Sequence, residues 1–108
     1  MNYKIKWTST AYSDFSCIIL NIKEMWGKNS AQQFINQIKT TVDLLSMFPQ
    51  SGKVIFEEKQ IRAFVISKQT TIIYRIKQDI VTILNLFDNR QNPDNLKVND
   101  KQEVYKID

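Results

Sequence analysis

Beyond the first few residues, the spacing of apolar residues changes only once, near residue 53. That single change limits which folds the chain can adopt. From residue 11 to residue 48, apolar residues recur at spacings of three and four, which is the period of an amphipathic helix. From residue 53 onward, apolar and polar residues alternate, which is the period of a strand. A sequence that groups its helices and then its strands favours an α+β fold.

Two apolar stripes predict two helices, over about 9–26 and about 30–48. The first stripe contains Ala11, Phe15, Ile18, Ile22 and Met25. The second stripe contains Phe34, Ile35, Ile38, Val42, Leu45 and Phe48. Both stripes face the core in this interpretation, and the short connection between the helices requires an antiparallel hairpin.

Both predicted helices begin and end at residues that are common at helix ends. Those residues are Thr8 or Ser9, then Gly27, then Asn29 or Ser30, and finally Pro49. Gly27 stops the first helix. Ser30 and Gln33 have the spacing of a capping box, which predicts the start of the second helix at Asn29 or Ser30.

Five strands complete the predicted domain. Residues 3–7 alternate in polarity, and four later strands are predicted over Lys53–Phe56, Ile61–Ile66, Thr70–Ile76 and Ile80–Phe87. The last of these is apolar on both faces, which is typical of an interior strand. We expect the helical hairpin to pack on one face of an antiparallel sheet formed by strand 3–7 and the later meander. Residues 1–96 then form one domain, and 97–108 form a polar tail.

The composition excludes several kinds of chemistry. The chain has no histidine, one cysteine and two separated glycines, so we expect no metal site, no cofactor and no phosphate-binding loop. Cys17 lies in the region of the first stripe and is interpreted as a buried structural residue. No apolar run approaches the roughly 20 residues that span a bilayer. A single cysteine allows no internal disulfide, which favours a reducing cytoplasm.

Positive charge is concentrated in the strand region. The formal net charge is +4, and residues 53–77 contain more lysine and arginine than glutamate. Such a cluster attracts nucleic acid or an acidic protein, although a solvated lysine-rich surface gives the same pattern. Arg75 lies within an apolar strand, where its charge needs a partner. Arg90 follows the last strand, at a position where functional loops are common.

The order of short motifs along residues 3–96 resembles the RelE/ParE superfamily of type II toxin–antitoxin toxins. The motifs are Tyr3–Trp7, Trp26-Gly27, Phe48-Pro49 with Gly52, Ile73-Tyr74-Arg75-Ile76 and Asp88-Asn89-Arg90-Gln91-Asn92-Pro93. The resemblance implies a cytoplasmic bacterial toxin, of the kind also called a plasmid stabilisation protein. It further implies that a small acidic antitoxin binds the toxin and neutralises it.

The resemblance also separates two possible targets. RelE-like members cleave mRNA on the ribosome, whereas ParE-like members inhibit DNA gyrase. Thr71 and Leu96 replace the arginine and the tyrosine that the RelE type often has, while Arg90 matches. We therefore expect a ParE-like inhibitor of DNA gyrase that works by contact rather than by catalysis. The expected target-binding residues are Arg62, Arg75, Asn89, Arg90 and Asn92.

Two alternatives remain open at the level of sequence. The first is a metal-independent endoribonuclease acting on ribosome-bound mRNA, in which Arg62 and Arg90 stabilise charge and Tyr74 or Tyr105 supplies a proton. The second is an inactive toxin homologue that is retained for binding its partner. No membrane association is expected in any of the three cases.

Overall fold

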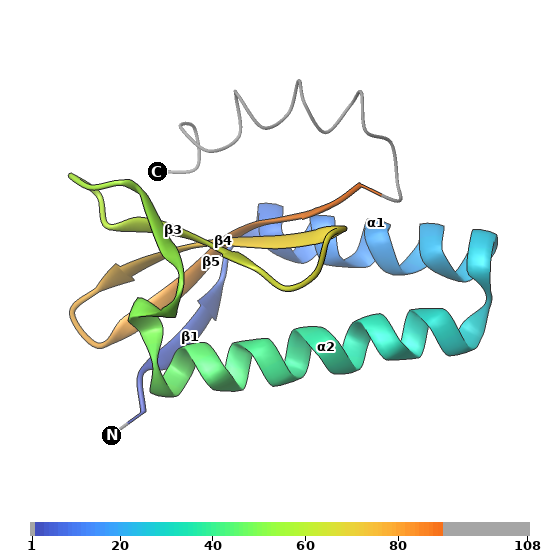
Figure 1. Ribbon diagram of the computed structural model, residues 1–108, viewed down its shortest axis with the longest axis horizontal. Coiled ribbons are helices and arrows are strands. Elements are labelled where there is room, and N and C mark those ends of the chain that lie inside the picture. The colour runs from blue at the N-terminus through green and yellow to red at the C-terminus, as the bar shows by residue number, and fades with distance from the viewer. Residues whose placement is uncertain (1, 90–108) are drawn as a thin grey trace.

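Two antiparallel helices cover one face of a single five-stranded sheet in this computed structural model, which describes residues 2–89 (Figure 1). The elements are β1 (Lys4–Trp7), α1 (Ser9–Trp26), α2 (Lys28–Met47), the short 3₁₀ helix η1 (Pro49–Ser51), β2 (Lys53–Phe56), β3 (Ile61–Val65), β4 (Thr70–Lys77) and β5 (Ile80–Asp88). This order confirms the predicted α+β fold, with its N-terminal strand, helical hairpin and meander. Arg90, Asn92, Tyr105 and the tail 97–108 lie outside the described residues.

The strand order in the sheet is β1-β5-β4-β3-β2, so β5 is an interior strand as predicted. Strands β2 to β5 form an antiparallel meander. Strand β1, in contrast, pairs with β5 in parallel, from Lys4 opposite Ile80 to Trp7 opposite Ile83. The prediction of an entirely antiparallel sheet was wrong for this strand. Alternating polarity specifies which face of a strand is buried, but not the direction in which the strand pairs.

Thr8 joins β1 to α1 and caps the helix, as the sequence predicts. Its side-chain oxygen accepts a hydrogen bond from the Ala11 amide at 3.0 Å. The same hydroxyl lies 3.2 Å from the carbonyl of Ile83 and 3.1 Å from that of Leu84. The cap therefore also links the first turn of α1 to the interior strand β5.

Replacing Thr8 with alanine is expected to lower the free energy of unfolding by about 1–2 kcal/mol, because the N-cap bond and the link to β5 are lost together. Urea denaturation followed by circular dichroism measures the difference. Ser13→Ala, at an exposed position of the same helix, is the control and should change stability by less than about 0.5 kcal/mol.

The start of α2 differs from the prediction. The helix begins at Lys28, with Gly27 as its N-cap and no side-chain capping bond. Ser30 donates its hydroxyl hydrogen bond back to the Trp26 carbonyl at 3.3 Å instead of capping α2. Gly27 has a φ of +96°, a conformation that glycine adopts without a Cβ penalty. The chain therefore turns tightly enough at Gly27 to start the helix before the capping-box sequence is reached.

Three residues predicted to be buried are exposed. Met25 is 62% exposed and Phe48 is 60% exposed, because each lies at the end of its helix, beyond the facing element. Cys17 is also exposed, because it lies on α1 about 100° around the helix axis from the buried Ile18. The spacing of these residues was that of a helix. Two of them nevertheless lie too near a helix end to reach the core, and Cys17 lies on a side of α1 that faces away from it.

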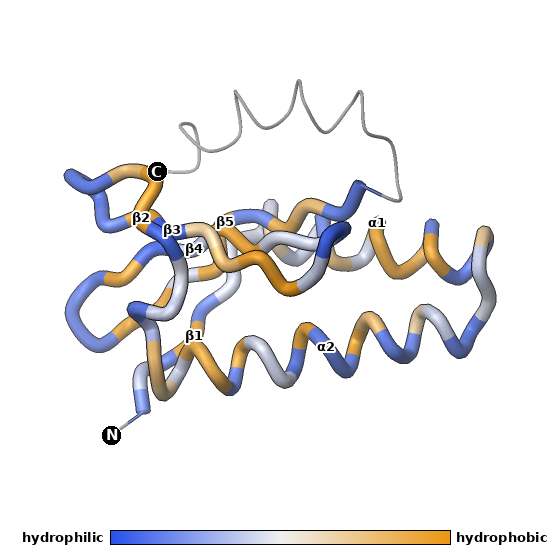
Figure 2. The backbone as a smooth tube through the Cα atoms, viewed as in Figure 1, coloured by the Kyte–Doolittle hydropathy of each residue, from blue (hydrophilic) through white to orange (hydrophobic). Residues whose placement is uncertain are grey.

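The hydrophobic core lies between the helical hairpin and the sheet. It joins Ile18 and Ile22 of α1 and Phe34 of α2 to Tyr74 and Ile83 of the sheet. Figure 2 shows apolar segments alternating with polar ones along both helices, as this one-sided packing requires. A second, smaller cluster lies on the opposite face of the sheet. It contains Ile61, Ile73 and Leu84, with Phe56, Ala63 and Phe87 packed against them.

Candidate functional site

Tyr74 fixes the turn that connects α2 to the sheet. Its side chain is fully buried on β4, and its hydroxyl donates to the Pro49 carbonyl at 2.6 Å. The same oxygen accepts a hydrogen bond from the Gly52 amide at 2.9 Å. Burial raises the pKa of Tyr74 above its usual value of 10.0, and this effect exceeds the opposing effects of the Gly52 hydrogen bond and the Arg62 charge. The hydroxyl is therefore protonated near neutral pH and engaged in two bonds.

Arg62 holds the same turn from the neighbouring strand. Arg62 on β3 pairs with Tyr74 on β4. One guanidinium nitrogen, Nη1, donates to the carbonyl of Gly52 at 2.8 Å and to that of Gln50 at 3.2 Å. The structure thus brings together two of the residues that the sequence singled out. Their observed bonds all go to backbone atoms of residues 49–52.

Gly52 is packed so closely against this pair that it admits no side chain. A Cβ atom at Gly52 would lie 2.6 Å from the Tyr74 hydroxyl oxygen and 3.0 Å from the Ala63 carbonyl. We expect Gly52→Ala to lower the free energy of unfolding by about 2 kcal/mol, because the clash breaks the turn bonds. Thermal denaturation measures the loss. Gln50→Ala in the same turn removes an exposed side chain, so an equal loss there would contradict this explanation.

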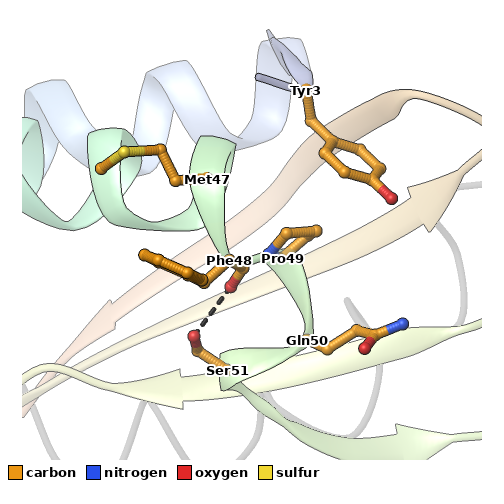
Figure 3. Close-up of a pocket in the computed structure, with 6 residues that line it drawn as sticks. All are labelled: Tyr3, Met47, Phe48, Pro49, Gln50 and Ser51. Atoms are coloured by element: carbon orange, nitrogen blue, oxygen red, sulfur yellow. Dashed lines mark hydrogen bonds between the residues drawn. The ribbon is translucent and has the colours of Figure 1, made fainter. Parts of the chain in front are cut away.

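The turn also borders an open hollow of about 440 Å³ at the end of α2 (Figure 3). Its lining residues are Tyr3, Met47, Phe48, Pro49, Gln50 and Ser51. The Ser51 hydroxyl donates to the Phe48 carbonyl at 2.7 Å, as drawn in Figure 3. Met47 is 49% exposed. The lining combines apolar side chains with hydroxyl and amide groups, and it contains no nucleophile paired with a base.

A second cluster of predicted residues lies where β5 ends. Thr70 donates its hydroxyl hydrogen bond to the buried carboxylate of Asp88 at 2.7 Å. The Asn89 amide donates to the Gln69 carbonyl at 2.8 Å, and its side-chain nitrogen donates to the Lys68 carbonyl at 3.3 Å. These bonds attach Asn89, the last described residue, to the turn between β3 and β4.

The predicted target-binding residues within the described part of the chain, Arg62, Arg75 and Asn89, therefore lie in different places. Arg75 neighbours Tyr74 on β4 but belongs to the opposite face, and it is half-buried between Ile61 and Thr82. Asn89 follows β5 and lies opposite Gln69, beyond the other end of β4, about 20 Å from Arg75 at the usual rise per strand residue. The structure brings Arg62 to Tyr74 but does not bring Arg75 to Asn89.

The sequence analysis missed a polar contact in the central strand. Asn85 is fully buried, next to a β-bulge at Leu84. The Asp14 carboxylate accepts hydrogen bonds from the Leu86 amide at 3.1 Å and from the Asn85 side chain at 3.4 Å. The Asn85 side-chain oxygen has no partner within residues 2–89. An asparagine inside an otherwise apolar strand was the available signal. The sequence contained no signal for the hollow, because the periodicity predicted Phe48 to be buried.

The described part of the chain contains neither a metal-binding cluster nor a membrane-spanning helix. Residues 2–89 contain no cluster of three metal-ligating histidine, cysteine, aspartate or glutamate side chains. None of the helices within that range has the length and apolar character needed to cross a membrane.

Comparison with known proteins identifies the class of this fold and then its family. A similar fold is found in solved structures of a ParDE toxin–antitoxin system and of the toxin–antitoxin complex RelBE2. The sequence profile of the ParE toxin of the type II toxin–antitoxin system parDE matches residues 5–93. The chain belongs to this ParE toxin family. No curated protein sequence matches it.

Three solved structures illustrate the shared fold. The chromosomal ParDE system from P. aeruginosa is similar at 20% identity and a TM-score of 0.67, over 80% of this chain and 95% of that chain. The toxin–antitoxin complex RelBE2 from Mycobacterium tuberculosis gives 18% identity and a TM-score of 0.61, over 82% and 99%. The DinJ-YafQ toxin–antitoxin complex from E. coli gives 10% identity and a TM-score of 0.58, over 85% and 98%.

Proposed function

We propose that this toxin arrests growth by binding DNA gyrase, without catalysing a reaction, and that a cognate antitoxin neutralises it in the cytoplasm. Membership of the ParE toxin family supports the toxin and antitoxin parts of this proposal. Solved complexes of similar fold pair a toxin with an antitoxin. The choice of gyrase over mRNA needs an argument from the site itself.

The bonding of Tyr74 is the observation that favours contact over catalysis. A ribonuclease without metal needs an acid or a base that reaches the substrate. The Tyr74 hydroxyl is buried, protonated and bonded to Pro49 and Gly52. Arg62 uses its guanidinium on the same turn. Both groups therefore support the backbone, which is the expected role in a protein that presents a rigid surface.

The proposed gyrase-binding residues are Arg62, Arg75, Asn89, Arg90 and Asn92. Arginine is common among the residues that dominate the affinity of protein interfaces. Asn89, which directly precedes Arg90 in the sequence, is bonded to the turn between β3 and β4. We propose that Arg90 makes the principal contact, that Arg75 adds a second, and that Arg62 acts mainly by positioning the turn at Gln50 and Gly52.

Regulated expression in a heterologous bacterium tests the proposal. We expect growth arrest with gyrase-linked DNA breaks, and no discrete cleavage of translated mRNA by primer extension. A host with a toxin-resistant gyrase should grow normally. Cleavage within codons would instead favour an endoribonuclease, and absence of any growth arrest would favour an inactive homologue.

A further inference from the structure

Asp88, the last residue of β5, carries a buried carboxylate. Of all the acidic and basic side chains within residues 2–89, it alone is fully buried, with 1% of its surface exposed. Removing a carboxylate from water is costly unless hydrogen bonds and a positive charge compensate for it. Neither the turn at Tyr74 nor the proposed gyrase contacts use this group, so its burial needs an explanation of its own.

Thr70 orients the Asp88 carboxylate. The two residues are opposite each other in the β4–β5 ladder, and Thr70 is fully buried as well. The Thr70 hydroxyl donates to Asp88 Oδ2 at 2.7 Å. A hydroxyl fixes the direction of a carboxylate but has no positive charge. The bond therefore positions the carboxylate for a cation without neutralising it.

Arg90 is the arginine nearest to this carboxylate along the chain, two residues after Asp88. Two residues of chain span at most about 7 Å, so the long side chain of Arg90 can reach back to the carboxylate. Asn89, between them, donates its amide to the Gln69 carbonyl at 2.8 Å and its side-chain nitrogen to the Lys68 carbonyl at 3.3 Å. Asp88 and Asn89 are therefore both held by the start of β4 and the turn before it.

Lys68 is another cation close to Asp88 in the fold, and it fits the carboxylate less well. Its side chain is exposed, and the lysine ammonium is strongly hydrated. An arginine guanidinium is planar and binds both oxygens of a carboxylate at once. It is also more weakly hydrated, which favours arginine in buried ion pairs. The chemistry of the two groups therefore favours Arg90 as the partner of Asp88.

We propose that Asp88 is a positioning residue for Arg90. Its carboxylate, oriented by Thr70, binds one side of the Arg90 guanidinium and limits the directions in which that side chain extends. A guanidinium has five N–H donors, so the others stay available to gyrase. Because the side chain is ordered before the complex forms, less conformational entropy is lost on binding. This inference rests on the proposed function, and it explains why a costly buried charge lies two residues before the principal contact.

Asp88→Asn removes the charge while keeping the shape of the side chain. With purified DNA gyrase as the probe, surface plasmon resonance should show that affinity falls about ten-fold, an effect typical of coupled neighbouring groups. Asp79→Asn makes the same change at an exposed site before the other end of β5, and its affinity should stay within about three-fold of the unchanged chain. Circular dichroism should show that both variants are folded.

Thr70→Val and an Arg90→Lys background test whether Asp88 acts through Arg90. Thr70→Val keeps the carboxylate but removes the bond that orients it, so affinity for gyrase should fall at least about three-fold. Thr70→Ser keeps the hydroxyl and should retain the affinity. In the Arg90→Lys background, Asp88→Asn should lower affinity much less than in the unchanged chain, because lysine lacks the bidentate contact.

NMR tests the contact in the free toxin, without gyrase. The Arg90 Nε–H proton should exchange slowly with water in the unchanged chain and in Asp79→Asn, and quickly in Asp88→Asn. Equal exchange in Asp88→Asn and the unchanged chain would overturn the proposal. So would equal affinities of Asp88→Asn and Asp79→Asn for gyrase, where the unchanged chain binds it. If the unchanged chain does not bind gyrase while Asp88 protects the Arg90 proton, the proposed function fails and the positioning contact stands.

Discussion

Arg90→Ala is expected to abolish growth arrest while the variant still folds and binds its antitoxin. In the proposed function, Arg90 makes the principal contact with gyrase, and truncating such an arginine commonly costs about 2 kcal/mol or more of binding free energy. That loss lowers affinity by roughly thirty-fold or more. Plating after induction measures growth arrest, and DNA-break assays in the same cells measure the effect on gyrase.

Arg90→Lys and Lys68→Ala separate the possible causes. Arg90→Lys keeps the charge but loses the planar fork of donors, so it should retain only part of the toxicity. Lys68→Ala removes an exposed charge from the turn next to Asn89, and toxicity should persist. Full toxicity of Arg90→Ala would contradict the proposed contact.

Tyr74→Phe is expected to lower the free energy of unfolding by about 3 kcal/mol. The change leaves the Pro49 carbonyl and the Gly52 amide without their partner in a buried place, and each such group costs about 1–3 kcal/mol. Urea denaturation measures the loss. Tyr12→Phe is the matched control, because the Tyr12 side chain is 65% exposed. At a temperature where the variant is folded, it should still arrest growth, and loss of toxicity in the folded variant would favour the ribonuclease alternative.

The same hydroxyl should make stability depend on alkaline pH. Burial raises the pKa of Tyr74 above its usual value of 10.0, so above pH 10 the unfolded chain loses the Tyr74 proton before the folded chain does. The contribution of the Tyr74 hydroxyl to the free energy of unfolding is complete below pH 10. It is lost as the pH rises from 10 through the pKa of Tyr74 in the folded chain. The stability difference between the unchanged chain and Tyr74→Phe should therefore shrink above pH 10. If the denaturation midpoints of the unchanged chain and of Tyr74→Phe differ by the same amount at every pH from 8 to 11, this explanation is contradicted.

Local patterns in the sequence were sufficient to predict most of the fold. The stripe through Ile18 and Ile22, the Thr8 cap and the alternation after residue 53 each encode local structure, and the structure confirms them. The parallel direction of β1 could not be predicted, because it depends on contacts with residues about 75 positions away. Exposure of Met25 and Phe48 likewise depends on where the neighbouring elements end, which periodicity does not encode.

The candidate site was predictable only as a set of residue types. The sequence selected Arg62 and Tyr74 because charged and phenolic groups serve both catalysis and binding. Their bonds to residues 49–52 emerge only when β3 and β4 bring them under the turn.

The parallel pairing of β1 with β5 also affects when the toxin can form during its synthesis. Residues 4–7 leave the ribosome first, yet their only partner strand is Ile80–Asp88, the last described element. Contacts this distant in sequence form slowly, because a long loop must close before they add stability. A nascent chain that stops before residue 80 has helices and a hairpin but no place for its first strand. The sheet is therefore completed only after residues 80–88 have been made, because β1 has no neighbour among β2, β3 and β4.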